Sequence, residues 1–185
     1  MRVIAGSAKG RRLAGPKSKQ IRPVLDQVKE AVFNILFDVA GLKVLDLFAG
    51  TGAMGIEALS RGAAYCCFVD VSREAVRLIG KNIDACGFAQ QSYVLPTTIG
   101  KAADLLAEQH KTFDLVFIDP PYEKFLVKKT LCRLVKSPIV HGQTLFVVEH
   151  HPKEHCEPVK GMNLTDQRKY GQTRVSFLQK VPDTC

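Results

Sequence analysis

The sequence predicts an α/β protein in which helices cover both faces of a mostly parallel, doubly wound sheet. Short apolar segments alternate with segments of helical periodicity between residues 43 and 150, as in stacked βαβ units. A glycine-rich stretch directly follows the first apolar segment. The length of 185 residues suits one domain with a sizeable core.

The expected strands are short and rich in Val, Leu, Ile and Phe. In chain order they are residues 43–48, 64–71, 92–96, 113–119 and 144–150, with further candidates near 162–170 and 173–179. The last two lie too close together in sequence for a helical crossover. We therefore expect seven strands, the final pair forming an antiparallel hairpin at one edge of the sheet.

Helices are expected between these strands because apolar residues recur there at helical spacing. The predicted ranges are 54–62, 72–87, 99–110 and 125–136. A further helix precedes the first strand, with Asp26 as its cap and apolar positions continuing to Val39. Ser72 is a possible cap for the second helix of the alternating region.

The N-terminal residues carry most of the positive charge. The net charge is +8, and residues 1–30 hold eight Lys/Arg against two Asp/Glu, whereas residues 31–150 are balanced. Residues 2–5 and 11–13, with glycines between them, can form a short hairpin. The sequence thus predicts a basic arm (1–25) beside a single domain (26–185). A nucleic acid is the expected partner, and a solvated tail is the alternative.

Several classes of protein are not indicated. No apolar run approaches the roughly 20 residues that span a bilayer, and the N-terminus does not resemble a secretory signal. The six cysteines include no C-x-x-C pair, which is typical of reduced thiols in a cytoplasmic protein. His151 and His155 have the spacing of zinc ligands, but Pro152 argues against a continuous helix, so no metal is expected.

The stretch DLFAGTGAMG, from Asp46 to Gly55, matches G-x-G-x-x-G. Gly50 and Gly52 allow a sharp turn and a close approach of the backbone to a ligand. In sheets of this kind ligands bind beyond the carboxyl ends of the strands. Asp70 ends the next strand and can accept both hydroxyl hydrogens of a ribose. These features alone would suit a dinucleotide.

Asp46 argues against a dinucleotide because a buried carboxylate repels a pyrophosphate. The same carboxylate favours a ligand with an ammonium and a sulfonium group. The chain also has no room for the separate substrate domain of a dehydrogenase. We therefore expect S-adenosylmethionine, with Phe48 and Val71 among its contacts beside Asp46, Gly50, Gly52 and Asp70.

A second motif, FIDPPY, ends the fourth strand of the alternating region. Asp119 and the carbonyl of Pro120 can each accept one N–H of an exocyclic amine, which directs the nitrogen lone pair to a methyl donor. Pro120 and Pro121 fix the backbone. Tyr122 can stack on a base that has been flipped out of its helix. These four residues are the expected catalytic group.

Five segments together resemble the bacterial RsmD-type 16S ribosomal RNA guanine-N2 methyltransferases, a Rossmann-like class I family. They are RVIAGSAKGRRL, IRPVLDQVKEAVFNILF, DLFAGTGAMGIEALSRGA, FIDPPY and KYGQTRVSF. The resemblance covers nearly the whole chain. It implies a monomeric bacterial enzyme of the cytoplasm that methylates one guanine N2 in 16S ribosomal RNA or the small ribosomal subunit.

The resemblance also implies roles for individual residues. The segment containing Arg22, Pro23 and Asp26 would lie over the cofactor. Arg11, Arg12 and Arg22 would meet RNA phosphates. The family usually has two threonines where this chain has Val24 and Leu25. We therefore expect no hydroxyl contact to the cofactor from these two positions.

A further departure concerns the adenine contact. Many class I enzymes have an acid after the third strand, but this chain has Thr97 and Thr98. Glu149, at the end of the fifth strand, is either close to the target pocket or a satisfied strand-end acid.

Two other functions remain open at this point. DNA adenine and cytosine amino-methyltransferases also use D-P-P-Y, but they usually carry a target-recognition insert, and no stretch of this chain is spare. A non-catalytic RNA-binding assembly factor could keep the fold. The intact Asp46, Asp70 and Asp119 argue against this second alternative.

Overall fold

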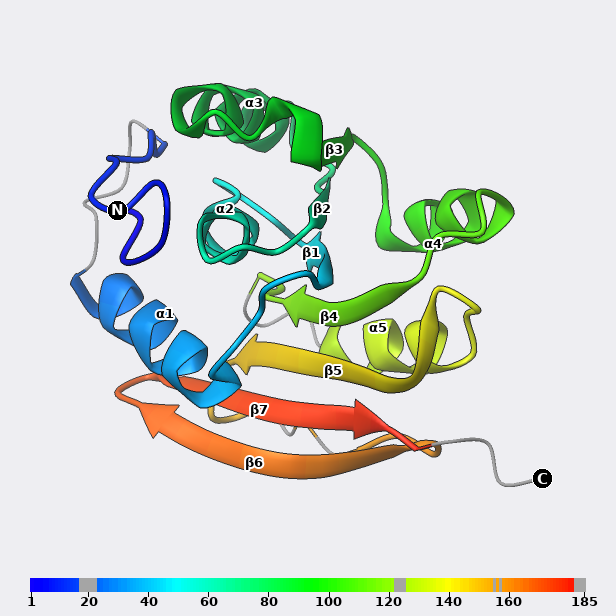
Figure 1. Ribbon diagram of the computed structural model, residues 1–185. Helices are drawn as coiled ribbons and strands as arrows, with labels where there is room; N and C mark the ends of the chain where they lie inside the picture. Colours follow the sequence, from blue (N-terminus) through cyan, green and yellow to red (C-terminus); the bar gives the residue numbers. More distant parts are fainter. Residues whose placement is uncertain (17–22, 122–125, 155, 157, 182–185) are drawn as a thin grey trace.

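The computed structural model describes residues 1–16, 23–121, 126–154, 156 and 158–181, apart from the side chains of residues 23–25. Its seven strands form one sheet in the order β3-β2-β1-β4-β5-β7-β6 (Figure 1). The strands are β1 (Lys43–Leu47), β2 (Tyr65–Val69), β3 (Ser92–Leu95), β4 (Phe113–Ile118), β5 (Val140–His150), β6 (Met162–Tyr170) and β7 (Thr173–Lys180).

The first five strands pair in parallel, whereas β7 is antiparallel to both β5 and β6. The predicted edge hairpin is therefore confirmed, with β6 outermost. The order reverses at β1, since β2 and β4 flank it on opposite sides. Ligands of doubly wound sheets bind at this reversal point.

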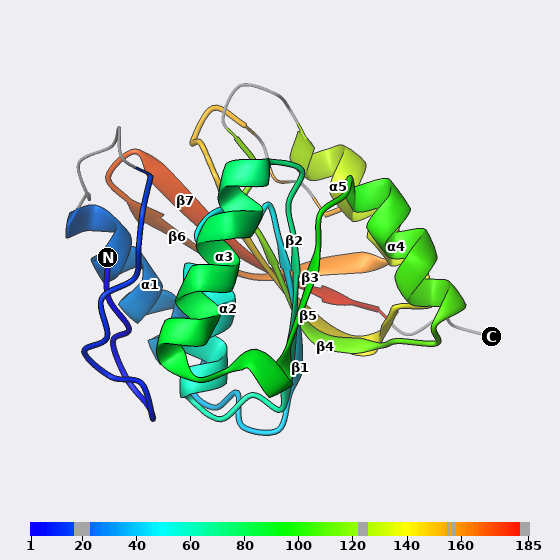
Figure 2. The ribbon, with the colours of Figure 1, turned by 90° about the horizontal axis from the view of Figure 1, so that it is seen from above.

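The described residues contain five α-helices that cover the sheet: four connect consecutive strands, and the first precedes β1. They are α1 (Pro23–Leu36), α2 (Ala53–Ser60), α3 (Arg73–Cys86), α4 (Ile99–Glu108) and α5 (Leu126–Val135). Figure 2 shows α1, α2 and α3 on one face and α4 and α5 on the other. Each face has its own apolar core, and the strands between them are apolar on both sides, as a covered parallel sheet requires. The predicted fold class is confirmed.

Residues 1–16, here called the N-terminal loop, fold back on themselves and pack beside α1 and α2 (Figure 1). An antiparallel bridge joins Arg2 to Arg12, as the predicted hairpin requires. Val3 and Leu13 are buried in the core on the α1–α3 face. The basic side chains of this loop, Arg2, Lys9, Arg11 and Arg12, are exposed. The proposed division into residues 1–25 and 26–185 stays a prediction.

A buried carboxylate holds the N-terminal loop in place. Glu57, in α2, is fully buried and accepts hydrogen bonds from the backbone N–H groups of Ile4 (2.8 Å) and Ala5 (3.0 Å). It also pairs with Lys29 (3.3 Å) and Arg61 (2.9 Å). Because a buried charge is tolerated only when it is paired and hydrogen-bonded, removal of these partners would destabilise the loop and α2 together.

Asn82, in α3, ties the same loop to the glycine-rich turn. Its side-chain amide donates to the carbonyls of Ala14 (3.0 Å) and Thr51 (2.9 Å), and its oxygen accepts from the Ala14 N–H (2.7 Å). Asn82 is 1% exposed. The position of the glycine-rich turn therefore depends on the N-terminal loop.

Two details differ from the sequence-based expectation. Helix α1 begins at Pro23 and contains Asp26 in its first turn, so the expectation that Asp26 caps this helix is wrong. Proline is favoured at the first helical position, where its missing N–H has no helical partner to lose. Strand β5 begins at Val140, four residues before the expected start. Ser72 is confirmed as the cap of α3, since its hydroxyl accepts from the Ala75 N–H.

None of the helices in the described parts of the chain is long and apolar enough to cross a membrane. The five described cysteines are all free thiols.

Candidate active site

The carboxyl ends of the parallel strands place four acidic side chains at one edge of the sheet. Asp46 lies in β1, Asp70 follows β2, Asp119 follows β4 and Glu149 lies near the end of β5. Parallel pairing of these strands aligns their carboxyl ends. The glycine-rich turn leaves β1 at the same edge, so both sequence motifs converge there.

The glycine-rich turn adopts left-handed backbone conformations. Gly50 and Gly52 have φ angles of 57° and 76°, and Phe48 has a φ of 58°. A non-glycine residue in this region costs on the order of 1 kcal/mol and often marks a functional site. A methyl group added at Gly50 would meet only the Phe48 carbonyl, at 3.9 Å. The backbone at Gly50 is therefore open to a ligand.

The third glycine of the motif has a different role. A Cβ at Gly55 would lie 2.4 Å from the Phe68 ring and 2.5 Å from the Cys66 sulfur. Gly55 thus allows α2 to pack closely on β2, and its N–H donates to Asp46 at 3.0 Å. The last glycine of the motif therefore serves packing.

Asp46 is 3% exposed, and burial raises its pKa to about 8. The hydrogen bond from Gly55 opposes this shift, whereas the charges of Asp119 and Asp70 add to it. A cationic group bound nearby would favour the ionised form of Asp46. An anionic group would meet repulsion from all three carboxylates.

Asp70 is held by two backbone N–H groups. One oxygen accepts from Gly50 at 2.9 Å and the other from Ser72 at 2.8 Å. Each carboxylate oxygen has a second lone pair, so Asp70 can still accept the hydroxyl hydrogens of a ribose. Val71, beside it, is 68% exposed, which leaves its side chain available for contact with a ligand.

The D-P-P turn lies beside the start of the glycine-rich turn. The Asp119 N–H donates to the carbonyl of Leu47, at the end of β1, over 3.5 Å. Pro120 is buried, and Asp119 and Pro121 are exposed. Tyr122 lies outside the described residues, so its expected stacking role stays a prediction.

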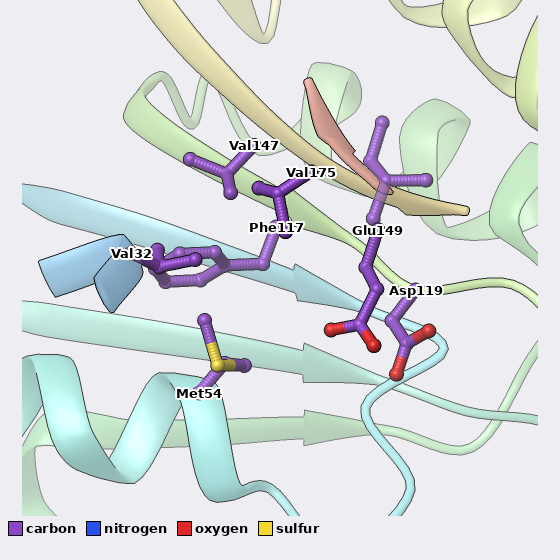
Figure 3. A pocket seen from close by; sticks show the side chains of 8 residues that line it. Val32, Met54, Phe117, Asp119, Val147, Glu149 and Val175 are labelled. Carbon is purple, nitrogen blue, oxygen red and sulfur yellow. The ribbon is translucent and has the colours of Figure 1, made fainter. Parts of the chain in front are cut away.

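A pocket opens between the two acids at the ends of β4 and β5. Six of its lining residues are apolar and come from α1, α2 and three strands: Val32, Met54, Phe117, Ile118, Val147 and Val175. Figure 3 shows the carboxyl groups of Asp119 and Glu149 side by side, next to these apolar side chains. The empty volume is about 240 Å³, which includes the open mouth. An apolar pocket with a few polar groups at its rim suits a flat, partly polar ligand.

The pKa values of Asp119 and Glu149 are both raised, because surrounding protein atoms exclude water from the carboxyl groups. The charge of Asp119 raises the pKa of Glu149 further. Asp119 is open to solvent at the mouth of the pocket, but protein surrounds its carboxyl on the other sides. Two neighbouring acids of this kind retain a proton between them near neutral pH.

Asp26 lies apart from the pocket. It lines a second hollow, between the N-terminal loop and α1, together with Arg2, Lys9 and Glu30. Its buried Oδ1 has no hydrogen-bond partner among the described residues. Arg22 and the side chain of Pro23 lie outside the described residues. The expected cofactor roles of all three stay predictions.

The remaining candidates lie elsewhere. Arg11 and Arg12 are exposed on the N-terminal loop, away from the four acids. Thr98 caps α4, since its hydroxyl accepts from the Lys101 N–H. The described residues contain no group of three His, Cys, Asp or Glu side chains arranged for a metal ion. His155 is not among them.

Sequence reasoning missed the apolar lining of the pocket and left Glu149 undecided. Val32 was expected on the apolar face of its helix, but nothing in the sequence indicated that this face borders Asp119. The sequence signal for Glu149 was its position near the end of an apolar strand, and Asp119 has a similar position. The sequence does not show that β4 pairs with β5, and this pairing brings the two acids together.

Comparisons with known proteins agree with this geometry. The family described as "Conserved hypothetical protein 95" matches residues 1–179. The "Putative rRNA methyltransferase YlbH" of Bacillus subtilis is 35% identical over 184 residues, which cover 97% of this chain and 99% of that protein. The "Ribosomal RNA small subunit methyltransferase D" of Escherichia coli K12 is 33% identical over 150 residues, 80% of this chain and 74% of that protein.

A solved structure, the "Putative methyltransferase yhhF from Escherichia coli", matches with a TM-score of 0.84 and 29% identity over 99% of both chains. A methylase of Haemophilus influenzae matches with a TM-score of 0.79 and 27% identity, over 97% of this chain and 98% of that one. The chain therefore belongs to the family described as conserved hypothetical protein 95, the RsmD-type ribosomal RNA methyltransferases.

Proposed function

We propose that this protein transfers a methyl group from S-adenosylmethionine to the exocyclic N2 of a guanine in 16S ribosomal RNA. The observation that carries the proposal is the position of Asp119. Its carboxyl lies above an apolar pocket, and its backbone is hydrogen-bonded to the end of β1, where the glycine-rich turn begins. The methyl donor and the target base would therefore meet at Asp119.

The residues at the β1–β2 side fit S-adenosylmethionine. Gly50 presents open backbone, Asp70 keeps free lone pairs for ribose hydroxyls, and buried Asp46 favours a cationic ligand over a pyrophosphate. Phe48 and Val71 flank these groups in the chain. Arg22, Pro23 and Asp26 would cover the cofactor from the side of α1, as the family resemblance implies. When bound, the cofactor supplies an electrophilic methyl group on a sulfonium.

The residues at the β4 side fit an exocyclic amine. Asp119 and the carbonyl of Pro120 would each accept one N–H of guanine N2. Held in this way, the nitrogen would point its lone pair at the methyl group, and the sulfur would keep the electron pair of the C–S bond. The amine loses one proton to Asp119 or to water. Positioning supplies much of the rate.

A nucleic acid substrate is supported by the exposed basic side chains of the N-terminal loop, Lys9, Arg11 and Arg12 among them. Phosphate contacts of this kind provide affinity without base specificity. The relative named for small-subunit ribosomal RNA supports 16S RNA, or the small subunit that contains it, as the substrate. We further propose that the protein acts as a monomer in the bacterial cytoplasm, where this substrate is found.

The test is methyl transfer from tritium-labelled S-adenosylmethionine to three acceptors in parallel: naked 16S RNA, 30S particles from an unmethylated strain, and duplex DNA. We expect label in RNA or 30S particles, and nuclease digestion followed by mass spectrometry should identify N2-methylguanosine. Label in duplex DNA alone, or methylation of another base atom, would contradict the proposal. Inactive protein that still binds RNA tightly would instead indicate an assembly factor.

A further inference from the structure

Glu149 stands level with Asp119 on the same face of the sheet. Strands β4 and β5 pair so that Phe117 is opposite Val147 and Ile118 is opposite Val148. Residues two positions further along a strand lie on the same face. Asp119 and Glu149 therefore follow Phe117 and Val147 on the face that forms the pocket floor, as Figure 3 shows.

The carboxyl of Glu149 is free of donors from the part of the chain that the structure describes. Among the described residues, no backbone N–H and no side chain is hydrogen-bonded to its carboxyl, although it is half-buried. This contrasts with Glu154, another acid of the same region, which accepts from the Val127 N–H. The Glu149 carboxylate therefore keeps its lone pairs free to accept from a ligand.

The strand order places Glu149 on the side of Asp119 that faces away from the cofactor residues. The glycine-rich turn and Asp70 belong to β1 and β2, whereas β5 lies beyond β4. A ligand that spans the edge from Asp70 to Asp119 ends before it reaches Glu149. A group bound beside Glu149 would therefore lie outside the cofactor.

We propose that Glu149 determines base specificity by accepting the N1–H of the target guanine. This inference rests on the proposed function, in which Asp119 and the Pro120 carbonyl accept the hydrogens of N2. On the Watson–Crick edge of guanine, the N1–H donor is adjacent to the N2 amine. The N1–H donor of a bound guanine favours the ionised form of Glu149 over the protonated form that the raised pKa gives the free protein. Adenine N1 and cytosine N3 are acceptors at the corresponding place, so the ionised carboxylate would repel either base beside its own exocyclic amine. Flipped bases are commonly recognised through this edge.

The test changes the Watson–Crick edge of the substrate and one side chain of the protein. After the methylated guanine has been mapped, a 16S RNA with 2-aminopurine at that position is prepared by splinted ligation and assembled into 30S particles. 2-Aminopurine keeps the N2 amine, but its N1 is an acceptor. The single-turnover rates of wild-type protein, Glu149→Gln and the control Glu108→Gln are measured on both particles. Glu108 is an exposed residue at the end of α4.

We expect the wild-type protein and Glu108→Gln to prefer guanine over 2-aminopurine by on the order of 100-fold or more, because the analogue leaves a buried acceptor unpaired. In Glu149→Gln the amide NH₂ can donate to N1 of the analogue. The preference should therefore shrink by about tenfold or more, partly through a gain on 2-aminopurine. Cofactor affinity, measured by calorimetry, should stay unchanged.

An unchanged guanine preference in Glu149→Gln, with equal losses on both substrates, would overturn the inference and leave the proposed function standing. The inference would also be overturned if Glu149→Gln loses activity only because its thermal stability or its cofactor affinity has fallen. If the wild-type protein methylates neither guanine-containing RNA nor 30S particles, the proposed function fails and the assignment of Glu149 fails with it.

Discussion

The acids at the carboxyl edge of the sheet differ in how many hydrogen bonds the protein donates to them. The β1–β2 half of this edge holds Asp46 and Asp70, and the β4–β5 half holds Asp119 and Glu149. At the β1–β2 half, Asp46 accepts from Gly55, and Asp70 accepts from Gly50 and Ser72. At the β4–β5 half, no described residue donates a hydrogen bond to the carboxyl of Asp119 or Glu149. The first half is organised before any ligand arrives, because backbone groups fix its acids. The second half has acceptors that only a substrate can satisfy, which suits recognition of a donor-rich base.

The largest expected effect would come from Asp119→Ala, which removes an acceptor from the β4–β5 half alone. The methyl transfer rate should fall by about 10²–10⁴-fold, the usual contribution of a positioned acid or base. Calorimetry should show S-adenosylmethionine affinity within several-fold of wild type, since the β1–β2 half is intact. Near-normal turnover would remove Asp119 from its catalytic role, and a parallel loss of cofactor affinity would erase the distinction between the halves.

Asp46→Asn tests how much the ionisation of buried Asp46, in the β1–β2 half, lowers the free energy of unfolding as the pH rises. The unfolded chain ionises Asp46 near its ordinary pKa of 3.8, whereas the folded protein holds the proton to about pH 8. The stability contributed by the protonated form is therefore complete below pH 3.8 and is lost as the pH rises to about 8. Asparagine does not titrate, so wild type should lose on the order of a few kcal/mol more than the variant across this window.

Urea unfolding of both proteins at pH 4.5, 6 and 7.5 measures this difference. The other raised carboxyls, Asp119 and Glu149, are present in both proteins, so the difference between the two curves isolates Asp46. If the free energies of unfolding of the two proteins change with pH in parallel, Asp46 ionises in the folded protein as easily as in the unfolded chain.

Gly55→Ala probes the packing beneath the glycine-rich turn. The new methyl group would overlap Phe68 and Cys66, and overpacking of this kind typically costs about 1–3 kcal/mol. The matched control is Gly80→Ala in α3, where an added Cβ meets nothing within 4 Å. There the substitution should stabilise the helix by about 0.5–1 kcal/mol. Thermal unfolding should move the two melting temperatures in opposite directions, and a shared direction would contradict the geometry.

The smallest effects are expected outside both halves, at Arg11 and Arg12. Each alanine substitution should weaken RNA binding by a similar factor for all sequences. It should also reduce the slope of log affinity against log salt by about 0.7–0.9, the value of one phosphate contact. Fluorescence anisotropy between 50 and 200 mM salt, values typical for such titrations, would measure this. A substitution that leaves the slope unchanged identifies an arginine that only faces solvent.

Much of the fold was accessible from the sequence, because local signals agreed with tertiary structure. Apolar strands, helical spacing and the Ser72 cap each depend on neighbouring residues. The start of α1 was also legible, since Pro23 is a typical first helical residue, but the capping preference of Asp26 obscured it. The early start of β5 was hidden by the polar sequence HGQT, in which Thr144 is nevertheless fully buried.

Other features depend on residues far apart in the chain. Lys29 is one of the eight basic residues among positions 1–30, yet it is 2% exposed and is paired with Glu57. One of the eight basic residues of the N-terminal segment is therefore unavailable to a polyanion. No local pattern marks this pair, because its members are distant in sequence and become neighbours only when α1 packs against α2.

The attachment of the N-terminal loop through Asn82 sets an order of events during synthesis. Ala14 and Asn82 are 68 positions apart, and at a typical 5–20 residues per second translation takes about 3–14 s to cover that distance. Residues 1–16 thus exist for seconds before their partners in α2 and α3 do. Val3 and Leu13, which end in the core, are exposed during that interval. The newborn chain would present a basic, apolar segment to chaperones and to nearby RNA before it has a fold.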